Sequence, residues 1–156
     1  MNLLAFQSLC RHVSQSLAAD DIDALGESRP TTIQGETFEL LYPPEGRDAV
    51  LLTYLGRVDD EHARPVYEQL LLVQLTGWNN PDLRFGFDPV TGQVLLCTRL
   101  PAVAELQEDA LKALIERLLA QIEPWRGELL KPLQVETPFA RFMTADEASA
   151  ASPMVV

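Results

Sequence analysis

The chain has 156 residues, of which 47% are hydrophobic, and carries a formal net charge of -11 at pH 7. This length and composition predict one domain with a substantial core. The negative charge argues against nucleic acid and anionic membranes as partners, because both would repel the protein. The sequence contains neither an apolar run of the roughly 20 residues that a membrane span needs nor a secretory signal pattern. We therefore expect a cytoplasmic protein with a basic or mixed-charge partner.

The cysteines and histidines do not form a metal-ligand pattern. Cys10 and Cys97 lie far apart without a C-x-x-C pair, which predicts buried, reduced thiols. Neither histidine has a second histidine or a cysteine at ligand spacing. A loop counted from Asp21 superficially resembles a calcium site, but its fifth position is Leu25 and its twelfth is Thr32 instead of a glutamate. We expect no metal and no cofactor.

The first half of the chain predicts one helix followed by strands. Apolar residues at steps of three and four indicate a helix over residues 2–18, with Asn2 as its N-cap. The segment that follows breaks this period and is expected to be a loop. β-branched and aromatic residues then predict two strands joined by a Pro/Gly turn at 43–46 and preceded by a short candidate strand. These segments are 31–34, 37–42 and 49–56.

The second half predicts a helix, a hairpin and a longer helix. Acidic residues at 59–61 precede a helix that carries Pro65 in its first turn and ends at Gly77. Segments 83–88 and 93–99 form the next hairpin, because the turn between them contains proline and glycine. The last helix is expected over 104–122, where Pro124 should end or kink it. Its inner face should carry Leu111, Leu114, Leu118 and Ile122.

The element order predicts an α+β fold in which one antiparallel sheet packs with three helices. Residues 1–131 should form this domain. Residues 132–156 lose periodicity and become rich in Ala, Ser, Thr and Pro, so we expect a mobile C-terminal tail.

The strands carry more apolar residues than one sheet face requires. In the first hairpin Val50, Leu52 and Tyr54 should point to one face, and Leu51 and Leu55 to the other. The second hairpin shows the same excess, and the second helix is apolar around much of its circumference. Three explanations are open: a second copy of the chain, a partner polypeptide, or complete coverage by the chain's own helices.

No common enzyme signature occurs in the sequence. Cys10 and His12 should lie on different sides of the first helix, so they would not form a catalytic pair. His62 follows acidic residues at a helix start and is best explained as a solvated side chain, while Trp78 and Trp125 are expected to anchor packing or interfaces. We do not expect an enzyme. A small enzyme or ligand-binding α+β domain with an unrecognised site, or a generic dimeric adaptor, is the alternative.

Several segments together resemble a known family. They comprise Leu70-Leu71 with Asn79, the run from Phe85-Gly86-Phe87 through Gly92 to Leu96, Leu100-Pro101, and a helix ending near Trp125-Arg126. This pattern is similar to the class I type III secretion chaperones, the group that includes the Tir chaperone. The resemblance spans roughly residues 2–130 and is sharpest over 70–101.

The resemblance implies an acidic homodimer with the order α-β-β-β-α-β-β-α in the cytoplasm of a Gram-negative bacterium. Such a chaperone holds the N-terminal chaperone-binding segment of an effector in extended form, keeps it soluble and presents it to the secretion machinery without hydrolysing ATP. The implied partners are the sister subunit, the effector segment and the secretion ATPase.

The resemblance also implies two sets of site residues. Effector-binding positions would fall on the first helix and the sheet, at Leu3, Phe6, Phe38, Leu40, Val50, Leu52 and Tyr54. The dimer interface would fall on the second helix and its neighbourhood, at Val66, Leu70, Val73 and Trp78.

Overall fold

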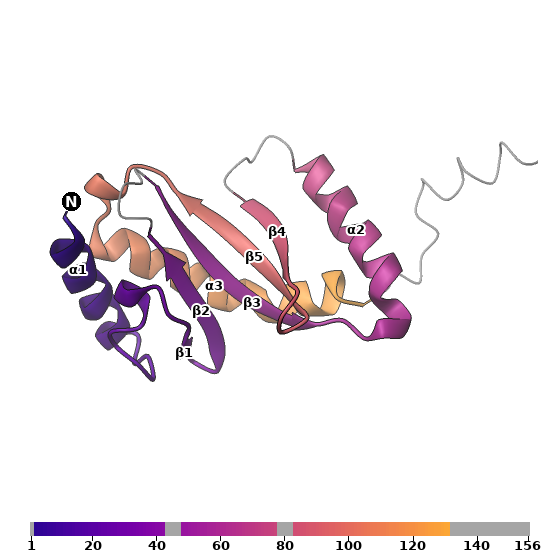
Figure 1. The fold of residues 1–156 in the computed structure, drawn as a ribbon, viewed down its shortest axis with the longest axis horizontal. Helices are drawn as coiled ribbons and strands as arrows, with labels where there is room; N and C mark the ends of the chain where they lie inside the picture. The colour runs from indigo at the N-terminus through magenta and orange to yellow at the C-terminus, as the bar shows by residue number, and fades with distance from the viewer. Residues whose placement is uncertain (1, 43–47, 78–82, 132–156) are drawn as a thin grey trace, which may run out of the picture.

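A computed structural model describes residues 2–42, 48–77 and 83–131 (Figure 1). Its elements follow the expected order, α-β-β-β-α-β-β-α, which confirms the α+β fold. The helices and strands are α1 (Leu3–Ser16), β1 (Thr31–Ile33), β2 (Glu36–Leu41), β3 (Ala49–Arg57), α2 (Ala63–Thr76), β4 (Leu83–Asp88), β5 (Gln93–Leu100) and α3 (Glu108–Leu129). Short 3-10 turns are η1 (Leu25–Glu27), η2 (Asp60–His62) and η3 (Val103–Glu105). The expected turn at 43–46 lies outside the described residues.

The five strands form one antiparallel sheet in the order β1-β2-β3-β5-β4. In Figure 1, α3 runs behind the sheet, α1 lies at one end of α3, and α2 stands beside β4. Helix α2 lies beside the β4 edge and partly covers it, and there the backbone N–H of Phe85 donates to Gln74 Oε1 at 2.9 Å. All three helices therefore lie behind the sheet or at its edge.

Burial alternates along the central strand β3. Leu51, Thr53 and Leu55 are fully buried, whereas the residues between them are only half-buried. The buried side chains face α1 and α3 and form one core with the inner residues of those helices. The alternation follows from the period of two in a strand. One face of the sheet is thus the core face, and the other remains at the surface.

Two predicted helix ends are confirmed. Asn2 caps α1, where its side-chain oxygen accepts a hydrogen bond from the backbone N–H of Ala5 at 2.8 Å. Gly77 caps the end of α2, and its N–H donates to the carbonyl of Val73 at 2.9 Å. These caps satisfy backbone groups that have no partner inside the helix.

The last helix differs from its predicted bounds. It begins at Glu108, after η3, and continues through Pro124 to Leu129. The proline removes one backbone donor, but the turn beyond it is held by tertiary contacts. Arg126 donates to the Leu55 carbonyl at 2.6 Å, while Trp125 and Leu129 pack against the core. Of the two predicted outcomes, an end or a kink at Pro124, the end is therefore wrong.

The inner stripe of α3 also differs in one position. Leu111, Leu118 and Ile122 are buried as predicted, but Ile115 is fully buried where Leu114 was expected. Leu114 is only partly buried against the same core. The 3.6-residue period makes the two neighbouring positions hard to separate from the sequence.

Candidate functional site

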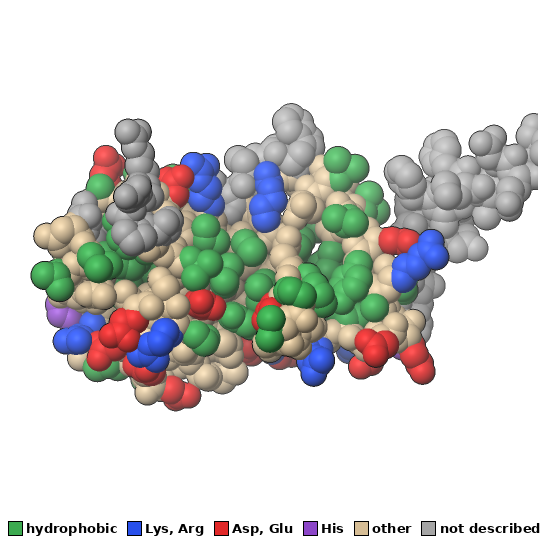
Figure 2. Space-filling view, in the orientation of Figure 1, with side chains coloured by type: hydrophobic (Ala, Val, Ile, Leu, Met, Phe, Trp, Pro, Cys, Tyr) green, Lys and Arg blue, Asp and Glu red, His purple; other side chains and the backbone are tan. Residues whose placement is uncertain are grey.

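The sheet face that points away from α1 and α3 is an apolar surface, which we call the open face. In the described part of the chain, no helix lies over it. Figure 2 views this side of the molecule and shows hydrophobic side chains gathered over the strands and continuing over α2. The apolar residues of the open face are Leu41 from β2, Val50, Leu52 and Tyr54 from β3, and Leu95 and Cys97 from β5. Among them Leu95 is buried by its neighbours and only 9% exposed.

Strand pairing orders the open face into three rows. The rows are Glu39-Leu52-Cys97-Arg84, Leu41-Val50-Arg99 and Tyr54-Leu95-Gly86. Val50, Leu52 and Tyr54 of β3 make the middle of the rows apolar, and Leu95 and Cys97 continue two of the rows onto β5. Glu39 adds an acidic group on the β2 side, and the two arginines add basic groups on β5 and β4. The surface is therefore apolar at its centre, with Glu39 at one side and the two arginines at the other, where Arg99 is paired with Asp48 at 2.6 Å.

Tyr54 joins the apolar centre to the acidic side. Its hydroxyl donates to Glu39 Oε2 at 2.8 Å. Burial raises the pKa of Tyr54 to about 12, and the hydrogen bond to Glu39 adds to the effect. The phenol is therefore neutral at physiological pH and fixes the position of the Glu39 carboxylate.

A second apolar surface lies on the outer side of α2. Leu71 is 66% exposed and Leu75 is 68% exposed, which is unusual for large aliphatic side chains on one helix. Nearby, Phe87 of β4 is half exposed, and its ring meets Tyr67 of α2 edge-on with centroids 5.5 Å apart. These residues form a stripe along α2 that the described part of the chain does not cover.

The predicted effector-binding residues separate into two groups. Val50, Leu52 and Tyr54 lie half-buried on the open face, and Leu3 is half exposed at the start of α1. Phe6, Phe38 and Leu40 are fully buried. The prediction placed these last three residues at the surface, and the structure places them in the core.

The physical reason is the periodicity of each element. Phe6 lies on the inner stripe of α1, and Phe38 and Leu40 alternate onto the core face of β2. Sequence reasoning missed Leu41, Leu95 and Cys97, although alternation along the second hairpin placed Leu95 and Cys97 on one face. It also missed Leu4, which is 76% exposed beside Leu3.

The predicted dimer residues need a similar correction. Val66 and Leu70 are buried within the chain, because they face the core from α2. Val73 is half-buried, and Trp78 lies outside the described residues. The exposed large apolar residues of the helix are Leu71 and Leu75. The sequence does not distinguish them, because the helix is apolar around much of its circumference.

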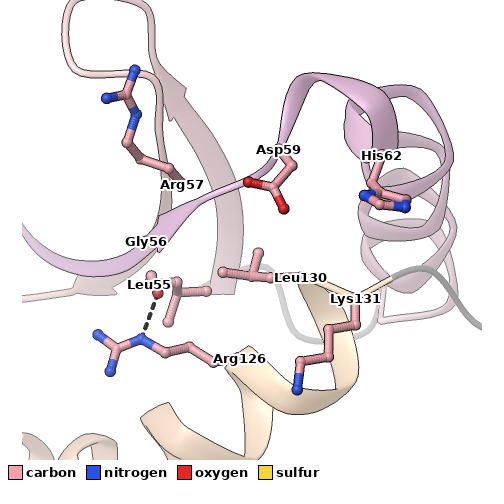
Figure 3. A pocket seen from close by; sticks show the side chains of 8 residues that line it. All are labelled: Leu55, Gly56, Arg57, Asp59, His62, Arg126, Leu130 and Lys131. Carbon is pink, nitrogen blue, oxygen red and sulfur yellow. Dashed lines mark hydrogen bonds between the residues drawn. The ribbon is translucent and has the colours of Figure 1, made fainter.

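A cavity of about 430 Å³ lies between the end of β3, the start of α2 and the end of α3 (Figure 3). Asp59 and Leu130 point toward it, while the guanidinium of Arg57 points away. Arg126, at its rim, donates to the Leu55 carbonyl at 2.6 Å and also binds the carboxylates of Glu36 and Glu123. This corner fixes the end of α3 to the sheet.

The reactive side chains are dispersed. Burial raises the pKa of the Cys10 thiol to about 12, and His12 lies exposed on the same helix, 2.8 Å from Glu108 of α3. His62 is exposed at the start of α2. Among the described residues, no group of three or more His, Cys, Asp or Glu is placed to hold a metal ion. None of the described helices is long and apolar enough to span a membrane.

Comparisons with known proteins bear on both the fold and the family. A chain in the crystal structure of the ExsC-ExsE complex is 22% identical, with a TM-score of 0.64 over 86% of this chain and 100% of that one. A chain of the "HopA1-SchA Chaperone-Effector Complex" is 20% identical, with a TM-score of 0.56 over 80% of this chain and 95% of that one. These likenesses show that the fold is shared.

A sequence comparison with curated proteins finds no match. The model of the Tir chaperone protein (CesT) family, in contrast, matches residues 11–126. The match covers most of the described domain and includes the block over 70–101 that carried the resemblance. The chain therefore belongs to the Tir chaperone protein (CesT) family, and the type III secretion chaperone function expected from its sequence is confirmed at the level of the family.

Proposed function

We propose that this chain holds the N-terminal chaperone-binding segment of an effector in extended form on the open face. The client stays soluble and competent for secretion while bound, in the cytoplasm. The observation that carries the proposal is the open face itself, where Val50, Leu52 and Tyr54 form an apolar surface that no described helix covers.

An extended segment suits this surface for two physical reasons. Apolar client side chains gain burial against Leu52 and its neighbours, at about 25 cal/mol for each Å² removed from water. An extended client can also run along the strands, so that every second side chain faces the open face. Binding in this form prevents the segment from collapsing or aggregating.

We also propose that two copies of the chain associate through the outer stripe of α2. Leu71, Leu75 and Phe87 are the large apolar side chains exposed there. A two-fold axis would place the same stripe on both subunits, so that each covers the other. Such a dimer presents two open faces, and one client can pass from the first to the second.

Two further expectations complete the proposal. The secretion ATPase is proposed as a further partner only because the family resemblance implies it. Residues 132–156 are proposed to be a tail outside the 1–131 domain, which is supported by the end of the family match at residue 126.

The test is co-expression of the chain with the N-terminal portion of the protein encoded by the neighbouring gene. We call this portion the client fragment. Size-exclusion chromatography with light scattering should give two copies of the chain and one fragment. Limited proteolysis should leave one protected client segment. A neighbouring metabolic operon and no complex would favour the small enzyme or ligand-binding alternative. Binding of a folded partner without a protected segment would favour an adaptor.

A further inference from the structure

The chain continues through residues 132–156 beyond Lys131, where the described residues end. Within this stretch, residues 138–143 read Pro-Phe-Ala-Arg-Phe-Met, and we call them the tail segment. The tail segment combines two aromatic rings and a methionine with Arg141, which is the only basic residue after Lys131. Its composition therefore suits an apolar surface that carries an acidic group.

The tail begins at one end of the sheet. Leu130 packs there against the end of β3, since a Cβ built at Gly56 would lie 3.7 Å from Leu130 Cδ1. Arg126, one turn earlier, donates to Glu36 at the start of β2 at 2.8 Å. Tyr54 of the open face is two residues from Gly56, about 7 Å along the strand. The tail thus starts beside the Tyr54 end of the open face.

The tail is long enough to pass around this end of the sheet and reach the open face. Residues 132–138 span up to about 23 Å when extended, at about 3.3 Å per residue. Along β3, the open face measures about 13 Å from Tyr54 to Val50, and an extended chain from Phe139 to Met143 has the same length. The tail segment can therefore cover all three rows of the open face.

Alternate residues of the tail segment match these rows. In an extended chain, Phe139, Arg141 and Met143 point to the same side. The rows are also two residues apart along β3, so one of these side chains falls on each row. With Phe139 on the row nearest the start of the tail, Arg141 falls on the middle row and Met143 on the far row.

The middle row carries the group that an arginine needs. It contains Leu52 beside Glu39, whose carboxylate is held in place by the Tyr54 hydroxyl at 2.8 Å. A carboxylate accepts several hydrogen bonds, so Glu39 can bind a guanidinium in addition to the phenol. The aliphatic part of Arg141 would then cover Leu52 while its charged end reaches Glu39.

We propose that the tail segment docks on the open face of its own chain, with Arg141 on Glu39, and competes there with the client. The inference rests on the proposed function, because the client must use the same face. The cover is partial and exchanges with an open state, so that a client can displace it. It shields the apolar surface from other proteins while no client is bound.

Cys97 reports on this cover in the absence of a client. It lies in the middle row and is half-buried, whereas Cys10 is fully buried and should stay unmodified. Arg141→Glu brings a second carboxylate toward Glu39 and should release the tail segment. Iodoacetamide should then alkylate Cys97 at least about threefold faster than in the unchanged chain, which corresponds to a segment that covers the face in about two-thirds of the molecules.

Two further variants serve as controls. Lys131→Glu makes the same change of charge outside the tail segment and should leave the alkylation rate of Cys97 unchanged. Glu39→Arg combined with Arg141→Glu restores the ion pair with reversed charges and should return the rate toward that of the unchanged chain. Urea unfolding shows whether each variant is folded.

Competition with the client gives a second measurement. A face that is free in about one-third of the molecules raises the apparent dissociation constant of the client fragment about threefold. Arg141→Glu should therefore tighten binding of the client fragment by the same factor by which it speeds the alkylation of Cys97. Lys131→Glu should bind the fragment as the unchanged chain does.

The outcomes separate the two proposals. Equal alkylation of Cys97 in Arg141→Glu and Lys131→Glu overturns the docking of the tail segment, whatever the client does. Faster alkylation without tighter binding of the client fragment overturns the competition. If no variant binds the fragment, the proposed function fails, while the alkylation rates still decide whether the tail segment covers the face. Protection of Cys97 that increases with protein concentration would assign the cover to a second copy and overturn the inference.

Discussion

Leu51 and Leu52 are neighbours on β3 and point to opposite faces of the sheet. Leu51 is fully buried in the core, while Leu52 is half-buried on the open face. Truncating each residue to alanine compares the two faces with the same chemical change. The prediction is a large loss of stability for Leu51→Ala and a small one for Leu52→Ala.

The expected magnitudes follow from burial. Leu51→Ala removes a core side chain and leaves a cavity, which lowers the free energy of unfolding by about 2–5 kcal/mol. Leu52→Ala removes a side chain that already meets water, so the loss should be below about 1 kcal/mol. A domain of ordinary stability, about 5–15 kcal/mol, tolerates either change.

Urea denaturation followed by far-ultraviolet circular dichroism measures both variants. With a slope of about 2 kcal/mol per molar urea, the midpoint should fall by about 1–2.5 M for Leu51→Ala and by less than about 0.5 M for Leu52→Ala. Equal shifts would refute the reasoning, because Leu52 would then be covered in the free protein.

Three further predictions concern other parts of the structure. Arg126→Ala should lower the free energy of unfolding by about 1–3 kcal/mol, because it leaves the largely buried Glu36 carboxylate and the Leu55 carbonyl without their donor. Glu123 also pairs with Arg126, but its side chain is 80% exposed, so Glu123→Ala should change the free energy of unfolding by less than about 0.5 kcal/mol in the same urea assay. Leu71→Glu should convert dimers into folded monomers by light scattering, and a dimer of unchanged mass would exclude α2 as the interface. The Tyr54 pKa of about 12 exceeds the pKa of roughly 10 of an unfolded tyrosine. The neutral Tyr54 phenol therefore stabilises the fold fully below about pH 10, and this stabilisation is lost as the pH rises toward 12. A titration followed by tyrosinate absorbance should show a late-titrating tyrosine that is absent in Tyr54→Phe.

The element order could be predicted from the sequence because each segment carries a strong local signal. Asn2 caps the first helix, Gly77 ends the second, and the two hairpins have the expected strand composition. The end of α3 could not be predicted in this way. Arg126 reaches the Leu55 carbonyl, 71 residues away in sequence, and such a contact leaves no trace in the helical period.

The sequence predicts an apolar face on the sheet, but it identifies only some of the residues of that face. Alternation along β3 correctly separated Leu52 from Leu51. The family resemblance assigned the binding positions to helices and strands as a whole. Such an assignment does not distinguish the buried residues of an element from its exposed ones. Phe38 and Leu40 were therefore placed at the surface although they face the core. The rows that join Leu52 to Cys97 depend on pairing between β3 and β5, which the sequence does not specify.

The most direct test of the central claim is the affinity of the client fragment for Leu52→Asp, measured by isothermal titration calorimetry. A carboxylate at this position places an unpaired charge at the centre of the open face. We predict a folded protein with the same mass in solution as the unchanged chain and an affinity at least about a hundredfold lower. A folded Leu52→Asp that binds the fragment as tightly as the unchanged chain would contradict the account.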